Sequence, residues 1–213
     1  RPFIGRKGIG KLALLSCAKK ITILTKTIDS DITGGVIENA GLDQAIVDDV
    51  SANDYILSIP EAERIDQYKA NLANSGTVII FEDITDGIKN KIEYIRKQVA
   101  YFFRFSILDP TFNISINNNP ITLDELNDVI QSTQFVWPIN ETNDALLTII
   151  EESDSLKKNK KLKISGINVT GFIATVEKPS LLKIRGSNEK VTLDLFVNGR
   201  LRESNILKHI HTA

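Results

Sequence analysis

Short hydrophobic strands and short amphipathic helices follow one another in this 213-residue chain without a regular strand–helix–strand rhythm. Alternating β-branched residues predict strands over 21–25 and 77–82. Apolar residues at helical spacing predict the clearest helix over 88–105, and its aromatic side chains are interpreted as a core face. A doubly wound parallel sheet would need regular strand–helix–strand units. The pattern therefore predicts an α+β fold.

Weaker patterns complete this outline, with segment 29–50 interpreted as turn-rich and acidic. The other predicted elements are helices over 11–19, 61–72, 123–130 and 203–209, and strands over 55–59, 111–116, 163–176 and 191–197.

Composition excludes several classes of protein. Hydrophobic residues make up 42% and charged residues 25%, which is ordinary for a globular chain and unlike a disordered tail, a collagen or a coiled coil. No apolar stretch approaches the roughly 20 residues that cross a bilayer. One cysteine and two histidines leave no internal disulfide and no obvious zinc site. We expect a cytoplasmic protein with no membrane contact.

The chain starts at Arg1 and contains no methionine. We interpret this as an excised fragment of a longer protein, in which spacings would be short by one wherever a methionine had been lost.

Charge is unevenly distributed along the chain. Up to Val129 there are 14 Lys and Arg against 18 Asp and Glu, and from Ile130 onward 12 against 9. The most basic run, 157–163, could neutralise nucleic-acid phosphates. No aromatic residue is interleaved there for base stacking, so we interpret it instead as a solvated loop.

The glycine-rich segment 5–12, Gly-Arg-Lys-Gly-Ile-Gly-Lys-Leu, is the chemical centre of the sequence. Glycines let backbone amides approach an anion, and a following helix start adds its positive dipole end. The segment nearly matches a Walker P-loop, but Leu12 stands where Ser or Thr would bind Mg²⁺. It also fits a loose dinucleotide fingerprint or a simple helix-capping turn.

A further interpretation draws on other parts of the chain. Gly5, Gly8 and Gly10 before a helix, with a later Gly76-Thr77 opening a hydrophobic strand, resemble the GHKL ATPases: gyrase, the ninety-kilodalton heat-shock chaperone, histidine kinases and MutL. Segments 169–173 and 195–200, the second ending in Val-Asn-Gly-Arg, resemble the transducer domain of MutL and gyrase.

The resemblance implies the C-terminal part of a Bergerat-type α/β sandwich over 1–119 and a truncated transducer-like α/β domain over 120–213. The parent would be an ATP-hydrolysing conformational clamp that uses ATP and Mg²⁺, forms a homodimer and acts on DNA or on a protein client. The implied nucleotide-binding residues are Gly5, Gly8, Ile9, Gly10, Lys11 and Thr77.

The family's catalytic glutamate, its magnesium-binding asparagine and its adenine-binding aspartate would precede Arg1, and its transducer lysine would follow Ala213. We therefore expect no catalytic residue in the chain and no ATP hydrolysis by it alone. The alternatives are a non-catalytic nucleotide-sensing or interaction module of the same fold, and a P-loop kinase, which would need a buried parallel strand before Gly5.

Overall fold

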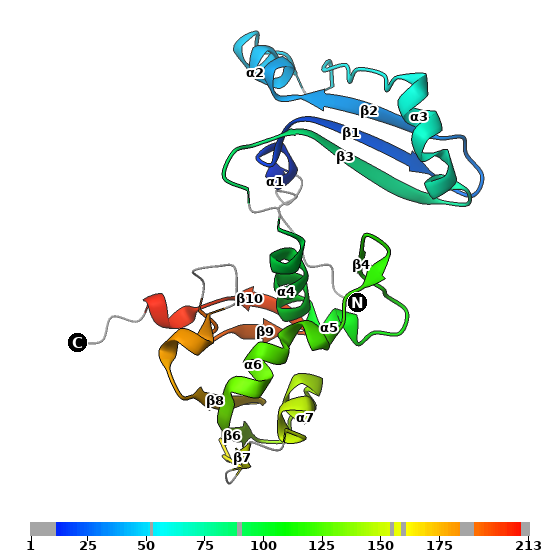
Figure 1. Cartoon of the computed structure of the whole chain (residues 1–213). Coiled ribbons are helices and arrows are strands. Elements are labelled where there is room, and N and C mark those ends of the chain that lie inside the picture. The colour runs from blue at the N-terminus through cyan, green and yellow to red at the C-terminus, as the bar shows by residue number, and fades with distance from the viewer. Residues whose placement is uncertain are drawn as a thin grey trace. The chain divides into compact units, whose positions relative to one another are not determined.

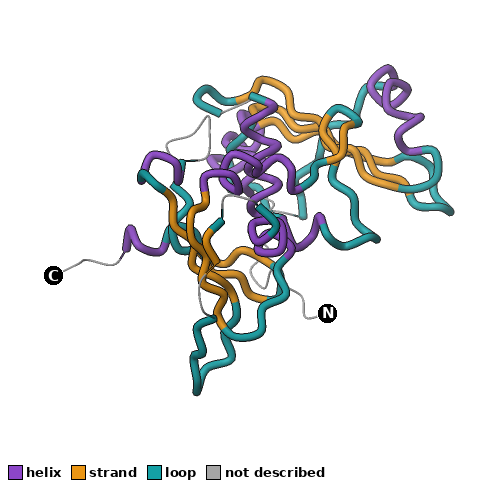
Figure 2. The backbone as a smooth tube through the Cα atoms, turned by 60° about the horizontal axis from the view of Figure 1, so that its bottom comes forward, coloured by secondary structure: helices purple, strands orange, loops and turns teal. Residues whose placement is uncertain are grey.

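The computed structural model describes residues 12–51, 53–88, 91–153, 156–158, 161–183 and 190–209. The chain divides into two compact units, unit 1 up to Ile88 and unit 2 from Lys89 (Figure 1). Helices are mixed with small sheets of two or three strands, most of them antiparallel (Figure 2). The predicted α+β class is confirmed at this level. These small sheets do not specify the Bergerat sandwich.

Unit 1 is built on an antiparallel sheet in the order β2-β1-β3. Its strands are β1 (Ala18–Lys26), β2 (Thr33–Glu38) and β3 (Gly76–Ile84). Thr22 lies opposite Val36 on one side and Ile80 on the other. The predicted strands over 21–25 and 77–82 are confirmed, because their β-branched residues suit a pleated, half-buried surface.

The described part of unit 1 contains the short helical segments α1 (Leu12–Leu15), α2 (Asn39–Val47), α3 (Ala62–Tyr68) and the 3₁₀ helix η2 (Lys69–Leu72). The last two confirm the helix predicted over 61–72. The helix predicted over 11–19 is wrong in its second half, since fully buried Ala18 already pairs with Ile84 in the sheet. Segment 55–59 forms only a bridge between Ser58 and Val36.

Unit 2 has a hydrophobic core between helices and a second three-stranded sheet. The helices are α4 (Ile92–Phe102), α5 (Arg104–Ile107), α6 (Asn127–Ser132), α7 (Ala145–Glu151) and the 3₁₀ helices η3 (Leu123–Leu126) and η4 (Pro179–Leu182). The sheet has the order β7-β6-β8, from β6 (Thr133–Ile139), β7 (Lys157–Lys158) and β8 (Gly171–Val176). The buried core comprises Ala100, Tyr101, Ile121, Leu123, Leu126, Ile130, Val136, Leu146, Leu147 and Ile150.

The helical stripe predicted over 88–105 is confirmed in α4 and α5, and the predicted helix over 123–130 is η3 followed by α6. Strand β6 and helix α7 were not predicted. The strand predicted over 163–176 is confirmed only in β8, and that over 111–116 only at its end, in β4 (Ser115–Ile116).

The boundary between the compact units lies well before the expected division of 1–119 from 120–213. Helix α4 packs with η3 and α6 in one core, and the Lys97 ammonium lies 2.8 Å from an oxygen of Asp128. Residues on both sides of position 119 therefore share a core. The assignment of separate functions to 1–119 and 120–213 stays a prediction.

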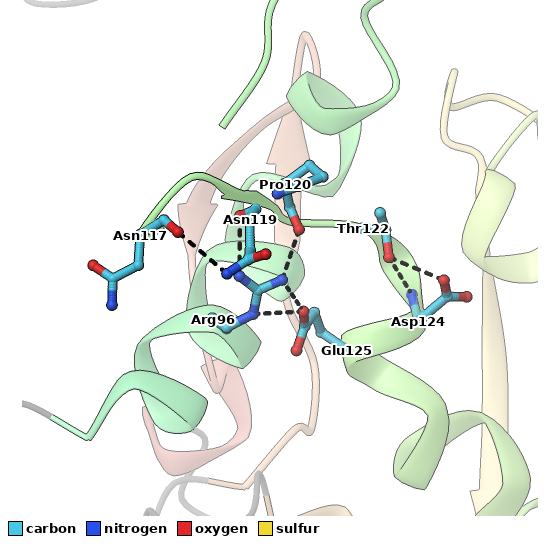
Figure 3. A network of polar contacts seen from close by, with 7 residues as sticks. All are labelled: Arg96, Asn117, Asn119, Pro120, Thr122, Asp124 and Glu125. Atoms are coloured by element: carbon cyan, nitrogen blue, oxygen red, sulfur yellow. Dashed lines mark hydrogen bonds and ion pairs between the residues drawn. The ribbon is translucent and has the colours of Figure 1, made fainter. Parts of the chain in front are cut away.

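A polar network joins α4 to the hairpin of β4 and β5 (Asn119–Pro120), whose Asn117 and Asn118 have the positive φ that such a tight turn requires. Figure 3 shows Arg96 between this hairpin and Glu125. Its guanidinium donates to the carbonyl oxygens of Asn119 and Pro120 at 3.1 and 2.6 Å, and its Nε donates to Glu125 at 2.7 Å. The planar fork of arginine is what allows these directions at once.

The C-terminal hairpin consists of β9 (Leu195–Val197) and β10 (Arg200–Glu203) and is followed by η5 (Ile206–His209). The helix predicted over 203–209 is thus confirmed only in its second half. Buried Arg104 pairs with Asp144 and lies 4.1 Å from the ring centroid of Phe196 in β9. Tyr101 donates to Asp194, and burial together with this carboxylate raises the pKa of Tyr101. Within the described ranges, no helix is long and apolar enough to cross a membrane.

Replacing Arg96 with lysine tests the polar network. Lysine keeps the charge but cannot reach Glu125 and two carbonyl oxygens together, so we expect the free energy of unfolding of unit 2 to fall by about 1–3 kcal/mol. Urea unfolding followed by the fluorescence of Trp137, the single tryptophan, measures it. The control Arg200→Lys changes an exposed arginine and should stay within about 0.5 kcal/mol. Equal stability of both variants would contradict the role of Arg96.

Candidate nucleic-acid interface

Strand β6 separates the core of unit 2 from an outer sheet face. Val136 is fully buried in a core cluster that also contains residues of helices α6 and α7. Successive side chains of a strand point to opposite faces, so Phe135 and Trp137 share the face away from this core. Both are half-buried. Burial of Val136 therefore turns two aromatic side chains outward.

The two aromatic rings stack on each other along the strand. Their centroids are 6.0 Å apart and their planes differ by 23°. On the neighbouring strand β8, Thr175 lies opposite Phe135 and Ile173 lies opposite Trp137, and Ile173 is 50% exposed. The result is an ordered apolar surface that solvent can reach.

Lys157, the first residue of the basic run predicted to be a solvated loop, lies beside these rings. Strand β7 pairs in parallel with β6 and places Lys157 opposite Phe135. The Lys157 ammonium is 5.5 Å from the Phe135 ring centroid, within the range of a cation–π interaction. Aromatic residues are absent from the basic run in sequence, but β6 supplies them in space. We call Phe135, Trp137, Ile173 and Lys157 the aromatic–basic face; segment 161–163 adjoins it at the end of β6.

Segment 161–163 is attached to the end of β6 by backbone and side-chain hydrogen bonds. The Leu162 amide donates to the carbonyl of Pro138 at 2.8 Å, and the Asn140 amide donates to the carbonyl of Leu162 at 2.9 Å. The Asn140 side chain accepts from the Ile164 amide at 2.9 Å and donates to the carbonyl of Val169 at 2.8 Å. Asn140 thus fixes where the basic segment runs.

Exposed charged side chains lie in and around this segment. Lys161 pairs with Glu141 at 2.6 Å, and its hydrogen bond and charge lower the pKa of that carboxyl. Glu141 is almost fully exposed, so this ion pair is weak and salt-sensitive. Lys157 and Lys163 are exposed too. Cations can neutralise nucleic-acid phosphates, and aromatic rings beside them can stack on bases. The structural alternative is a cation–π contact that only stabilises the sheet edge.

The residues predicted to bind a nucleotide are not brought together in the described part of the chain. Gly5, Gly8, Ile9, Gly10 and Lys11 lie outside the described residues. Thr77 is exposed on β3, where its hydroxyl lies 3.1 Å from that of Thr25 on β1. The role of these six residues stays a prediction.

A hollow of about 130 Å³ lies in unit 1, lined by Lys20, Thr22, Glu38, Arg64 and Glu82 among others. Both of the basic side chains in this lining are paired with one carboxylate, since Glu82 contacts Arg64 at 2.5 Å and Lys20 at 3.8 Å. Across the described ranges, no three His, Cys, Asp or Glu side chains are grouped so that they could hold a metal ion. We therefore take the aromatic–basic face, and not this hollow, as the candidate functional site.

Comparison with known proteins finds one informative relative. The whole chain aligns, at 28% identity over 218 residues, with a protein of Herpetosiphon aurantiacus named "Putative type II restriction enzyme HgiDII". The chain spans about a third of the length of that relative, 33%. No protein-family model and no solved structure matches the chain.

This match corrects the resemblance to the GHKL ATPases. The whole chain aligns with a protein named as a restriction enzyme, and neither family models nor solved structures support the ATPase assignment. The predicted ATP-operated clamp and its use of ATP are therefore wrong. Glycine motifs and a Gly-Thr pair report where a backbone turns or approaches a neighbour, and they do not specify a fold or an activity.

Substitutions of Asn140 test the attachment of segment 161–163. Asn140 has a φ of 52°, so glycine keeps the backbone and removes only the side-chain hydrogen bonds. We expect Asn140→Gly to lower the free energy of unfolding by about 1–3 kcal/mol, and Asn140→Ala by about 1–2 kcal/mol more. Urea unfolding followed by Trp137 fluorescence measures both. Wild-type stability in the two variants would show that Asn140 does not hold the segment.

Proposed function

We propose that this chain is the DNA-contacting part of a DNA-cleaving protein and that the aromatic–basic face makes the contact. The observation that carries the proposal is the position of Lys157 beside the stacked rings of Phe135 and Trp137 on an outer sheet face. The class of partner comes from the relative named as a restriction enzyme, an enzyme that acts on DNA. Because the chain spans about a third of that relative, cleavage is proposed for the full-length protein alone.

The basic and the aromatic side chains would contribute to DNA binding in different ways. Lys157 on the face, with Lys161 and Lys163 in the adjoining segment, would neutralise phosphates. Such contacts supply affinity with little sequence preference and make it dependent on salt. Trp137 and Phe135 offer ring faces on which unpaired bases stack, worth about 1–3 kcal/mol per base. Ile173 extends the apolar surface next to Trp137.

Cleavage of DNA by a restriction enzyme calls for Mg²⁺, which takes carboxylate oxygens and phosphates as ligands and stabilises the charge that develops on the reacting phosphate. The described residues do not fit such a site, because they contain no suitable group of three acidic, histidine or cysteine side chains. We assign Mg²⁺ to no residue of this chain and derive no step of cleavage through it.

Glutamine at positions 157, 161 and 163 tests the proposal on the chain itself. Binding to a fluorescent 30-base-pair duplex is followed by anisotropy at several salt concentrations. We expect the wild-type affinity to fall linearly with the logarithm of salt concentration, and the triple variant to reduce that slope by about 2–3, because each lost phosphate contact contributes about 0.9.

The matched control replaces three exposed lysines elsewhere, Lys19, Lys69 and Lys178, with glutamine. Its net charge equals that of the test variant. It should retain a slope close to that of the wild type. Equal slopes in the two triple variants would place the phosphate contacts outside the aromatic–basic face and its adjoining segment. Failure of the wild-type chain to bind duplex at low salt would overturn the proposal.

A further inference from the structure

Strand pairing places described residues in rows on the outer face of the unit 2 sheet. Residues directly opposite each other on paired strands point to the same face, and every second residue of a strand returns to that face. The face that carries Trp137 therefore continues along β6 to Ile139, and none of the residues in these rows is acidic. The rows are Lys157, Phe135 and Thr175; Trp137 and Ile173; and Leu162, Ile139 and Gly171.

The two stacked rings differ in how much of their surface is already occupied. Phe135 has Trp137 stacked on it at 6.0 Å and the Lys157 ammonium 5.5 Å from its ring centroid. Further along β6, Ile139 is paired with Gly171, where an added Cβ would meet no atom within 4 Å. The face is thus open on the Ile139 side of Trp137, and Trp137 is the ring on which a further planar group has room to stack.

Cationic side chains lie at both ends of this stretch of β6. Lys157 is opposite Phe135 at one end, and the exposed lysines of segment 161–163 adjoin Ile139 at the other. Phe135 and Ile139 are about 13 Å apart at roughly 3.3 Å per residue, with Trp137 midway between them. One strand of nucleic acid presents planar bases along a chain of anionic phosphates, so its charge and shape complement this arrangement.

The geometry distinguishes between unpaired and paired DNA. In a duplex, neighbouring base pairs cover the base faces, and a protein reaches phosphates and base edges. Stacking on Trp137 therefore requires a base that has left the duplex, whereas the lysines contact phosphates of either form. Phosphate contacts alone would favour the duplex, because it carries the higher charge density.

We propose that this face binds single-stranded or locally opened DNA in preference to duplex. One unpaired base stacks on Trp137, and the phosphates on its two sides lie at Lys157 and at segment 161–163. This inference rests on the proposed DNA contact and adds the form of DNA that the site selects. Phe135 supports the Trp137 ring from the side that the base does not use.

Three fluorescent probes of one sequence test the preference by anisotropy at low salt: a 20-nucleotide single strand, its matched duplex, and the same duplex with a mismatched bubble at its centre. We expect the chain to bind the single strand and the bubble at least about fivefold more tightly than the matched duplex. This is the lower end of what one stacked base contributes.

Variants of Trp137 separate stacking from charge. Trp137→Leu keeps an apolar side chain in the sheet but removes the ring, so the affinity for the single strand should fall at least about fivefold and that for the duplex less than twofold. Trp137→Phe keeps a ring and should retain part of the preference. The control Phe112→Ala removes an aromatic side chain that is 52% exposed in the loop before β4, and it should bind as the wild type does. Circular dichroism melting verifies that the variants fold.

The outcomes distinguish this inference from the proposed function. Tighter or equal binding of the matched duplex, or a single-strand affinity that Trp137→Leu leaves unchanged, would overturn the inference and leave the DNA contact standing. In the latter case a partner other than DNA covers the ring. Absence of binding to all three probes would overturn the proposed function, and this inference with it.

Discussion

The burial of Val136 in the core of unit 2 determines what the opposite face of its sheet can do. Because side chains alternate along a strand, the two neighbours of a core residue must point away from the core, and here both are aromatic. The parallel pairing of β7 then brings Lys157 to the same side. A solvent-facing surface that combines stacking rings and cations is therefore a consequence of how one strand packs.

Regular local patterns made part of this fold predictable. The stripe of apolar residues over 88–105 and the β-branched runs at 21–25 and 77–82 correspond to observed elements, because their periodicity matches the face that they bury. Helix α7 was not predicted: its Asp144 cap, which accepts from the Leu146 amide, gives a brief signal in a short segment. The helix expected to reach Lys19 ends early because pairing of β1 overrides helix propensity.

The candidate site could not be predicted from local sequence patterns, for a physical reason. The basic run contains no aromatic residue, and the rings that complete the face lie about twenty residues earlier, joined to it only by strand pairing. The glycine-rich segment 5–12 was predicted to be a binding site for the opposite reason, since its motif is local and easily recognised. Local motifs report a backbone conformation, whereas a binding surface depends on which strands the fold places side by side.

The single tryptophan makes the central claim directly measurable. Titrating the chain with a single-stranded 20-nucleotide oligonucleotide, while binding is followed independently by anisotropy, reports whether bases reach Trp137. If the aromatic–basic face binds DNA, Trp137 fluorescence should be quenched in proportion to the bound fraction and restored by high salt. Bound oligonucleotide with unchanged Trp137 fluorescence would contradict the account.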